Sequence, residues 1–553
     1  MHLFDVLTEG KRASLHDWDG PTVRSTPWDD VVAEAHRTAA GLRDAGVGPG
    51  VRVATILTNS RQAVSGLLGT WLAGGAVASL PIPARAMSMD EYTAQIAALT
   101  AHVGAPFLVT DARLLDSLPE ELGRRVETRS WESLPVDRSI DAAPPEPDEL
   151  AFVQYSSGST SSPKGCMLTA GAIGAQLEML ANMVDALPGG ETVAAWLPLS
   201  HDMGAFGCLL FTWALDGNLV LSSPERFMFD PRTWMCDCEA FGATLTAGPP
   251  SALPVAARTL RTGRISPQGL MLRHCVIGAE RIEWSAIRKA GAALEPYGMD
   301  ERLFMPAYGL AEATLAVCAQ PPETFPACRY LDGDALADGE IREVDPELDG
   351  GAMPVVSVGR PLDGTEVRMG DDERLSEIHV RSPSLASGYL GDPELTAERF
   401  RDGEFATGDL GFVRDGDLYV VGRSDDLLNV AGRNVHARLI EMAVDDLDRV
   451  RGGCSTIVDV ADDGRGRLVM LLELKDEDAA TDELAKRAAA IAASKGGVLL
   501  DECVFLPRGA LPKTPSGKPQ RFRCRQLVAT DGLDAIARVR LRRRAGAVAR
   551  HLT

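Results

Sequence analysis

Apolar runs of strand length alternate with helical repeats in the first part of the chain, and this alternation constrains the fold most strongly. Val51–Leu57 is an apolar run, a helical repeat follows over Ala63–Leu72, and a second apolar run covers Ala76–Leu80. Apolar residues at helical spacing over Tyr92–Val103 then precede the strand-like run Phe107–Val109. Strands joined through helices pair in parallel, with helices on both faces of the sheet. The sequence therefore predicts an α/β fold built on largely parallel sheets.

A stretch rich in serine and glycine, Tyr155–Gly165, follows the apolar run Ala151–Val153. Behind it, apolar residues recur at helical spacing over Ile173–Val184, with Thr169 in position to cap that helix. Small residues let backbone N–H groups approach phosphate oxygens, hydroxyls add donors, and Lys164 supplies positive charge. Taken alone, such a run is equally well a polar surface loop. Its place between a strand and a helix favours a phosphate site.

The composition limits the classes of partner. A chain of 553 residues is long enough for two or three domains. Its formal net charge of −22 argues against a general nucleic-acid or anionic-membrane partner, but a local positive site for a nucleotide does not depend on global charge. The N-terminus shows no basic segment leading into an apolar core, so we expect no secretory signal and a cytoplasmic location with reduced thiols.

Two local features have alternative interpretations. Cys236 and Cys238 flank one Asp, which is either a weak metal signal or, as we prefer, a pair of buried thiols. The uncharged stretch Gln62–Ala84 is long enough to raise the question of a membrane span. Because Gly74 and Pro81 interrupt it, we expect a buried helix running into a buried strand, and no membrane span.

Polar and small residues follow several of the expected strands. His201 comes just after the apolar run Ala194–Leu199, and further runs end at Gly248, Gly278 and Gly309. Ligands of α/β proteins usually bind beyond the carboxyl ends of strands. A glycine there lets a flat or bulky ligand approach the backbone. His201 is therefore a candidate site residue, although a hydrogen-bonded structural histidine is the equal alternative.

The segment Tyr308–Thr314 places a carboxylate, Glu312, one turn into an expected helix. This carboxylate either holds Mg²⁺ that bridges phosphates or stabilises the N-terminus of the helix. On this segment alone, the second interpretation is preferred.

The pattern changes after the first 330 residues. Leu331–Val356 is acidic, Gly-rich and weakly periodic, so we interpret it as an inserted excursion. Short strands over Glu366–Met369, Glu377–Val380 and Leu418–Val421 then predict a β-rich subdomain over about 357–424. Within it, Thr407–Asp409 is expected to set Asp409 on a tight turn, where its carboxylate would accept hydrogen bonds from a sugar diol.

A second domain is expected from Asp425 onward, giving domains 1–424 and 425–553. It has an α+β pattern of its own, with strands near Ser455–Val460 and Leu468–Leu474 and a helix near Asp482–Ala493. Near its end, Lys518 lies on a Pro- and Gly-rich loop that we expect to be mobile. The predicted fold is thus a large N-terminal domain of mixed and parallel sheets flanked by helices, with a β-rich subdomain, and a small mobile C-terminal domain.

Four of these segments, in this order, resemble the signature motifs of the adenylate-forming superfamily, which includes acyl- and aryl-CoA ligases, peptide-synthetase adenylation domains and luciferases. They are Tyr155–Gly165, Tyr308–Thr314, Thr407–Asp409 through Gly422–Gly432, and Pro512–Lys518. Three further features are most similar to fatty acyl-AMP ligases. They are Leu197–Gly204, the sequence Leu315–Val317 after the second motif, and the excursion that precedes Ser357–Pro361.

The resemblance implies that ATP and Mg²⁺ convert a carboxylic acid, fatty or otherwise bulky, to acyl-AMP with release of pyrophosphate. The acyl group would then pass to the thiol of 4′-phosphopantetheine on an acyl carrier protein. Two alternatives stay open: an acyl-CoA ligase that uses CoA as the acceptor, and a non-catalytic homologue that binds ATP or acyl-AMP. The small residues Gly204, Ala205 and Gly207 are consistent with room for a long tail, but serve packing equally well.

The resemblance also implies a role for each matching residue. Lys518 would bridge the attacking carboxylate and the α-phosphate, His201 would lie near the acyl entrance, and Glu312 would ligate Mg²⁺. The pyrophosphate side would be held by Ser156, Ser157, Gly158, Ser159, Thr160 and Lys164. The adenosine would be framed by Gly278, Ala279, Glu280, Tyr308, Gly309, Leu310 and Ala311, with Asp409 and Arg423 on the ribose. Asp425 would be the hinge, and the Gly432 region would line a thiol tunnel once the small domain has rotated.

The chain departs from the family pattern at two places. Ser161 replaces the usual Gly after Thr160, which changes the stiffness of the loop or its bond to phosphate. After Gly432, Ala437 replaces a frequent Pro, and Arg438 with Leu439 replaces a common polar or acidic pair. The second departure affects the expected acceptor more than the expected adenylation.

Overall fold

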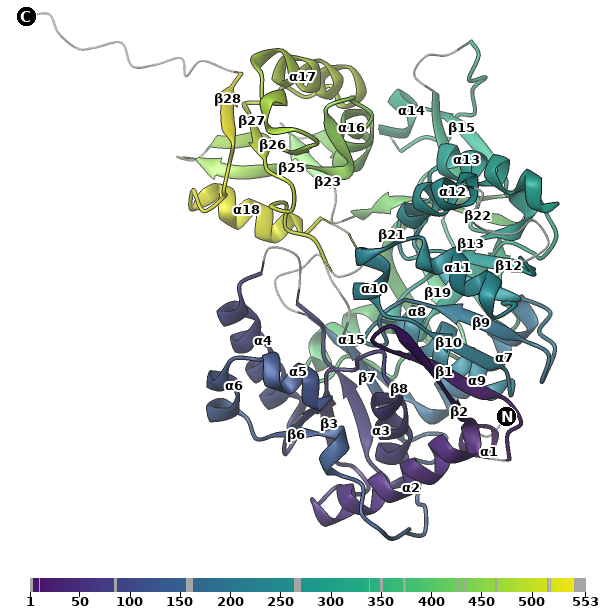
Figure 1. Cartoon of the computed structure of the whole chain (residues 1–553). Helices are drawn as coiled ribbons and strands as arrows, with labels where there is room; N and C mark the ends of the chain where they lie inside the picture. Colours follow the sequence, from purple (N-terminus) through teal and green to yellow (C-terminus); the bar gives the residue numbers. More distant parts are fainter. Residues whose placement is uncertain are drawn as a thin grey trace, which may run out of the picture.

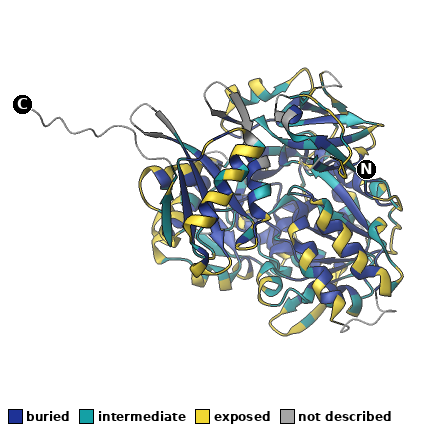
Figure 2. Ribbon diagram, turned by 90° about the horizontal axis from the view of Figure 1, so that it is seen from above, coloured by how far each residue is buried: buried dark blue, intermediate teal, exposed yellow. Residues whose placement is uncertain are grey.

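The computed structural model describes residues 3–8, 10–83, 87–155, 163–262, 270–337, 339–348, 352–370, 374–424, 427–430, 433–462, 465–514, 517 and 519–541. Figure 1 shows a large lower body, formed by the first part of the chain, and a smaller body that carries the C-terminal elements. Helices surround the strands in both, and Figure 2 shows that the strands are mostly buried while the helices expose one face.

The first sheet has six strands and contains the predicted alternation. Its order is β6 (Thr128–Ser130), β5 (Leu108–Thr110), β3 (Arg52–Thr55), β4 (Ala76–Ser79), β7 (Leu150–Tyr155) and β8 (Gly165–Thr169). All neighbours are parallel except β7 and β8, which are antiparallel. Successive residues of its central strands enter different cores: Val53 and Val77 face one, Ala54 and Ala78 the other. Because side chains alternate along a strand, burial on both sides produces the continuous apolar runs seen in the sequence.

Helices cover both faces of this sheet. On one face lie α2 (Trp28–Asp44) and α3 (Arg61–Leu72), and on the other lies α4 (Met89–Val103). The short helices α5 (Ala112–Ser117) and α6 (Glu120–Arg125) follow α4. The uncharged stretch examined as a membrane span is α3 followed by β4, as expected. Among the described residues, no helix has the length and apolar character needed to cross a membrane.

The second sheet has nine strands and shares a core with the first. Its order is β17 (Arg360–Pro361), β14 (Ala316–Ala319), β13 (Phe304–Gly309), β12 (His274–Ile277), β11 (Leu245–Gly248), β9 (Thr192–Ala195), β10 (Asn218–Leu221), β1 (Ser14–Asp19) and β2 (Thr22–Pro27). The strands from β13 to β1 run parallel, and their carboxyl ends point to one edge.

The helices of this region include α1 (Leu3–Thr8), α7 (Ala170–Met183), α8 (Asp202–Gly204), the π-helical turn η2 (Ala205–Leu210), α9 (Phe211–Ala214), α10 (Pro224–Phe229), α11 (Thr233–Ala240), α12 (Leu253–Arg261) and α13 (Trp284–Leu294). Thr169 caps α7 as predicted, because its side chain accepts from the backbone N–H of Ala172 at 3.1 Å.

The β-rich subdomain forms a sheet of β18 (Glu366–Arg368), β19 (Ser376–Arg381), β21 (Glu404–Arg414) and β20 (Phe400–Arg401), with β22 (Asp417–Arg423) also paired to β21. Helix α15 (Pro393–Arg399) leads into β20. The excursion Leu331–Val356 begins at the end of β15 (Cys328–Asp332), contains α14 (Gly333–Ala337) and ends with β16 (Ala352–Val356), which pairs antiparallel with β15. Its apolar side chains share a core with Phe412 and Tyr419 of the subdomain.

The C-terminal part has a sheet and a core of its own. A two-stranded pair, β23 (Leu427–Val430) and β24 (Arg433–His436), precedes a sheet of β25 (Val450–Asp462), β26 (Arg465–Leu474), β27 (Glu502–Leu506) and β28 (Ala537–Arg540). Helices α16 (Ala437–Asp445) and α17 (Asp482–Gly496) cover one face, and α18 (Arg521–Ala529) covers the other. Each face of this sheet has its own apolar core, and among the described residues both cores consist only of Leu428 and residues that follow it.

The α/β class and the β-rich sheet are therefore confirmed, and three local expectations are wrong. Strand β8 begins directly after Lys164 and pairs antiparallel with β7, so the expected direct passage from Lys164 to a helix is wrong. Asp409 lies inside the eleven-residue strand β21, where Gly408 has a φ of +75° and the pairing is irregular nearby, and not on a tight turn. Glu312 lies in a three-residue 3₁₀ turn, Ala311–Ala313, and not one turn into a longer helix.

Candidate functional site

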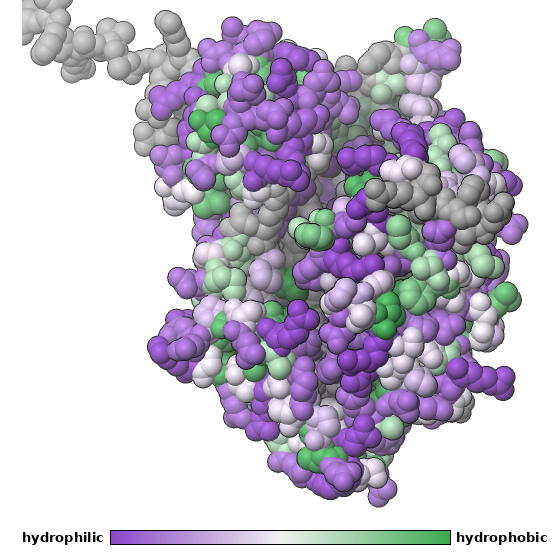
Figure 3. Space-filling model, in the orientation of Figure 1, coloured by the Kyte–Doolittle hydropathy of each residue, from purple (hydrophilic) through white to green (hydrophobic). Residues whose placement is uncertain are grey.

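A cavity of about 730 Å³ opens between the carboxyl edge of the nine-stranded sheet, the β-rich subdomain and the C-terminal part. Figure 3 shows that a hollow separates the largely hydrophilic C-terminal part from the rest of the chain on this face. The described site residues His201, Glu312, Lys164, Gly278, Ala279, Glu280, Tyr308, Gly309, Leu310, Ala311, Asp409 and Arg423 all line this cavity. The structure thus brings together residues as far apart in the sequence as Lys164 and Arg423.

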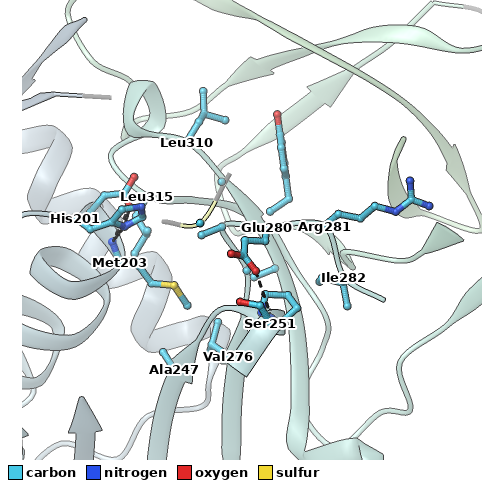
Figure 4. A pocket seen from close by; sticks show the side chains of 18 of the residues that line it. His201, Met203, Ala247, Ser251, Val276, Glu280, Arg281, Ile282, Leu310 and Leu315 are labelled. Carbon is cyan, nitrogen blue, oxygen red and sulfur yellow. Dashed lines mark hydrogen bonds and ion pairs between the residues drawn. The ribbon is translucent and has the colours of Figure 1, made fainter. Parts of the chain in front are cut away.

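One arm of the cavity is apolar. Helix α7, the turn from α8 to α9, and strands β9, β11 and β12 contribute aliphatic and aromatic side chains to it. They are Leu180, Met183, Val184, Val193, Met203, Phe211, Leu245, Ala247 and Val276. In Figure 4, Met203, Ala247 and Val276 lie on the same side of the cavity. Such an arm suits a hydrocarbon group, since an apolar ligand there leaves no protein polar group unpaired.

The carboxylate of Asp409 is fixed from two sides. The hydroxyl of Tyr308 donates to its Oδ2 at 2.5 Å, and Nε of Arg423 lies 3.6 Å from its Oδ1. Burial first, and then the charge of Asp409, raise the pKa of Tyr308 well above its ordinary value, so the hydroxyl remains a donor at neutral pH. The carboxylate of Asp409 is therefore held in a fixed orientation at the cavity wall.

A second polar group surrounds Glu312. The hydroxyl of Tyr389 donates to Oε1 of Glu312 at 2.8 Å, and Nζ of Lys164 lies 5.5 Å from the centre of the Tyr389 ring. Burial and the neighbouring carboxylate raise the pKa of Tyr389 above its ordinary value. The sequence analysis did not predict Tyr389 as a site residue. An aromatic residue between Gly388 and Gly391, in a segment without helical or strand periodicity, could have indicated it.

The turn that carries Glu312 is strained. Thr314 has a φ of +66°, which is rare for a β-branched residue, and its buried hydroxyl donates to the carbonyl of Ser384 at 2.7 Å. Packing also explains why residue 309 is a glycine, because a Cβ there would lie 1.7 Å from the carbonyl oxygen of Leu315. Internal packing thus accounts for this glycine without any ligand.

The segment after β12 forms another wall. Ala279 has a φ of +67°, and the carboxylate of Glu280 accepts from the backbone N–H of Ser251 at 3.3 Å. Figure 4 shows Glu280 turned toward Ser251, while Arg281 extends the other way. A non-glycine residue in the left-handed region indicates that the surrounding structure enforces this wall.

His201 lies at the start of α8, where its Nδ1 is 2.6 Å from Oδ1 of Asp202. Both side chains are largely buried, and both line the cavity. This pairing, and the bond that Nδ1 accepts from the backbone N–H of Met203 at 3.3 Å, fix the orientation of the imidazole.

The described residues of the C-terminal part that line the cavity include Lys513 and Pro519. These two residues form an isolated β-bridge, and the backbone N–H of Gly517 donates to the carbonyl of Thr514 at 2.9 Å. Gly517 has a φ of +92°, and a Cβ on it would lie 2.6 Å from Oε1 of Glu280. The loop therefore touches the wall behind β12 directly.

Several predicted site residues lie outside the described residues: Ser156, Ser157, Gly158, Ser159, Thr160, Asp425, Gly432 and Lys518. Their roles, and the domain boundary at Asp425, stay predictions. The flanking residues Lys164, Gly517 and Pro519 line the cavity. Cys236 and Cys238 are free thiols, and in the described ranges no three His, Cys, Asp or Glu side chains gather as a metal site.

Residues 8–390 match the model of the family described as AMP-binding enzyme. The chain belongs to this family. The AMP-binding enzyme is 30% identical to FadD26 of Mycobacterium bovis, a long-chain-fatty-acid–AMP ligase, over 92% of each chain. It is equally 30% identical, over 93% of each chain, to FadD25 of Mycobacterium tuberculosis, which is named as a fatty-acid–CoA ligase.

The fold of this AMP-binding enzyme matches solved structures as well. A structure from a study of fatty acyl-adenylate ligases of E. coli and L. pneumophila superposes with a TM-score of 0.84 over 96% of this chain and 98% of that one, at 24% identity. The superposition shows that the large body, the β-rich subdomain and the C-terminal part share the architecture of adenylate-forming enzymes.

The described residues include a suitable ligand for the Mg²⁺ ion that the family resemblance implies. Mg²⁺ is usually held by one or two carboxylates together with waters and substrate phosphates. Glu312 supplies one carboxylate at the cavity, and the hydroxyl of Tyr389 engages only its Oε1. When bound, the ion would neutralise phosphate charge beside Lys164.

Proposed function

We propose that the AMP-binding enzyme activates a fatty or other bulky carboxylic acid with ATP and transfers the acyl group to a pantetheine thiol, most readily that of an acyl carrier protein. The observation that carries this proposal is one cavity with two unlike ends. Its apolar arm suits the acyl tail, and its polar end gathers Lys164, Glu312, Asp409 and Arg423.

In the first step, an oxygen of the substrate carboxylate forms a bond to the α-phosphorus of ATP. The bond from that phosphorus to the bridging oxygen breaks, and pyrophosphate leaves. Both reactants are anions, so the protein must offset charge and hold geometry. Lys164 would offset charge on the pyrophosphate side, and Lys518 on the α-phosphate and the attacking oxygen.

The remaining side chains would orient the nucleotide. Asp409 would accept from the ribose hydroxyls, since Tyr308 and Arg423 hold its carboxylate in place. The segment Gly278–Glu280 would flank the adenine. His201 would lie where the acyl arm meets the phosphates, because it lines the cavity beside Met203.

In the second step, the acceptor sulfur forms a bond to the acyl carbon, the bond to AMP breaks, and the thiol proton leaves. A carrier protein is favoured by the excursion at β15–β16, which resembles the insertion of fatty acyl-AMP ligases. CoA is the alternative acceptor, and relatives of equal identity are named for each product.

A pyrophosphate-exchange screen over carboxylic acids, followed by transfer assays with CoA and with holo carrier protein, tests the proposal. We expect exchange with medium- or long-chain acids and faster transfer to the carrier. Rapid formation of acyl-CoA would instead favour the acyl-CoA ligase. ATP binding without exchange for any acid would favour a non-catalytic homologue.

A further inference from the structure

An ion pair joins the C-terminal part to the first sheet region. Arg523 of α18 donates from Nη2 to Oε2 of Glu91 on α4 at 2.8 Å, across 432 positions of sequence. The Arg523 side chain is 19% exposed, whereas that of Glu91 is 53% exposed. In Figure 1, α18 forms the lower edge of the C-terminal part and faces the region of α4. The arginine is therefore partly enclosed where the two parts meet.

The carboxylate of Glu91 is already oriented on its own side. It caps α4, because its Oε2 accepts from the backbone N–H of Ser88 at 2.8 Å and from the Ser88 hydroxyl at 3.0 Å. These bonds, the backbone one first, lower the pKa of Glu91, so it is ionised at neutral pH. A fixed carboxylate loses little side-chain freedom when a cation binds to it.

Arg523 is rigidly connected to the loop that enters the cavity. The bridge between Lys513 and Pro519 closes this loop just before α18 begins. In the first turn of α18, buried Arg521 forms two bonds with the buried carboxylate of Glu441, one of them at 2.9 Å from Nη2 to Oε2. The two ends of the loop, Lys513 and Pro519, are therefore tied to each other directly before α18, and we infer that the place of Arg523 sets the place of these ends.

We propose that Arg523 and Glu91 are positioning residues for acyl-AMP formation: their ion pair holds the Lys513–Pro519 loop in the cavity. The inference rests on the proposed function, in which this loop carries Lys518. The pair would have to separate when the C-terminal part rotates for thiol transfer, so it favours the first step over the second.

The two half-reactions of full-length enzyme separate this role from a general structural one. Glu91→Gln removes the charge but keeps a side chain that caps the helix. We expect Glu91→Gln and Arg523→Gln each to lower kcat for pyrophosphate exchange about 3-fold, as for a partly exposed ion pair. The double variant should fall no further, and transfer from preformed acyl-AMP should not slow. High salt should reduce the difference between wild type and variants.

Arg525→Gln is the matched control. Arg525 lies on the same helix and pairs with Asp459 at 2.6 Å, but both partners belong to the C-terminal part. We expect this control to leave exchange unchanged. Equal exchange in wild type, Glu91→Gln and Arg523→Gln would overturn the proposal, as would additive losses in the double variant.

A distance measurement keeps the test independent of catalysis. Spin labels on cysteines introduced at the exposed positions Ala98 of α4 and Ala529 of α18 report the separation of the two helices. We expect one narrow distance distribution in the wild-type background and a broader one with Arg523→Gln. Identical distributions would overturn the proposal. Absence of exchange with every acid in the wild type would instead refute the proposed function, and the distances would still decide the ion pair.

Discussion

Replacing Tyr389 by Phe would test whether Glu312 holds the metal in a fixed orientation. The substitution removes only the hydroxyl that donates to Oε1 of Glu312 at 2.8 Å. The ring keeps its edge-on contact with Phe400, with 5.6 Å between centroids, and its place beneath Nζ of Lys164. A hydrogen bond to a charged group contributes about 1.5–3 kcal/mol. Loss of a partner that orients a metal ligand typically lowers metal affinity about 10- to 100-fold.

We therefore expect Tyr389→Phe to raise the Mg²⁺ concentration for half-maximal pyrophosphate exchange about 10-fold or more, with little change in the maximal rate. Tyr419→Phe is the matched control, because Tyr419 belongs to the same subdomain as Tyr389 but does not line the cavity, and its hydroxyl accepts from Nε of Arg329 at 3.3 Å. Magnesium titrations that coincide for wild type and Tyr389→Phe would refute the reasoning.

Three further predictions concern the nucleotide, the acyl tail and pH. Tyr308→Phe leaves Oδ2 of Asp409 without its 2.5 Å donor, so the KM for ATP in exchange should rise about 10-fold while kcat changes little. Gly207→Val should exclude long acids, because Gly207 and Leu315 both line the cavity and a Cβ at Gly207 would lie 2.9 Å from Cδ2 of Leu315, so the added side chain takes up cavity space. We expect about a 10-fold loss of kcat/KM for long chains and little for short ones. Burial raises the pKa of Asp445 from 3.8 to about 7, so its protonated form stabilises the fold below about pH 4, and this contribution is lost as pH rises through 7. Urea unfolding should show Asp445→Asn gaining stability over wild type at pH 8, by at most about 4 kcal/mol, and little difference at pH 4.

Each of these expectations has an outcome that contradicts it. An unchanged KM for ATP in Tyr308→Phe would mean that Asp409 needs no orientation. A uniform loss across all chain lengths in Gly207→Val would indicate misfolding and not a shortened arm. Parallel stability curves for wild type and Asp445→Asn between pH 4 and 8 would show that the buried carboxyl does not titrate there.

The sequence predicted the strands that are buried on both faces of the sheet. The apolar runs before α3 and after it are β3 and β4, and their residues alternate between two cores. Strand β8 was missed because it has only five residues, Gly165–Thr169, too few to show a period. The bulged course of β21 around Gly408 was likewise interpreted as a turn, since a glycine between polar residues has the same composition in both settings.

The sequence predicted many of the residues at the site, but not the hydrogen bonds between them. Asp409 was expected near a ribose, yet its partner Tyr308 was expected near the adenine only. The bond between them joins residues 101 positions apart, which no local pattern reveals. The positive φ at Thr314 also has no sequence signal, because threonine rarely adopts it and only the buried bond to Ser384 explains it.

The Lys513–Pro519 loop holds two lysines, and we expect them to have different roles. Nζ of Lys513 donates to the carbonyl of Gly453 at 2.7 Å, so its charge is committed to closing the base of the loop. Gly517 and Pro519, which flank Lys518, both line the cavity. We therefore expect Lys518→Ala to lower pyrophosphate exchange about 100-fold or more, as for loss of a charge that stabilises a transition state, with thermal stability unchanged.

Lys513→Ala should show the opposite pattern. It should lower the free energy of unfolding by about 1–3 kcal/mol through loss of its bond to the backbone, while exchange stays within about 3-fold of wild type. Exchange and thermal unfolding measured on both variants decide the matter. If Lys513→Ala abolished exchange and Lys518→Ala did not, the cation of the first step would come from the base of the loop, and the roles assigned to the two lysines would have to be reversed.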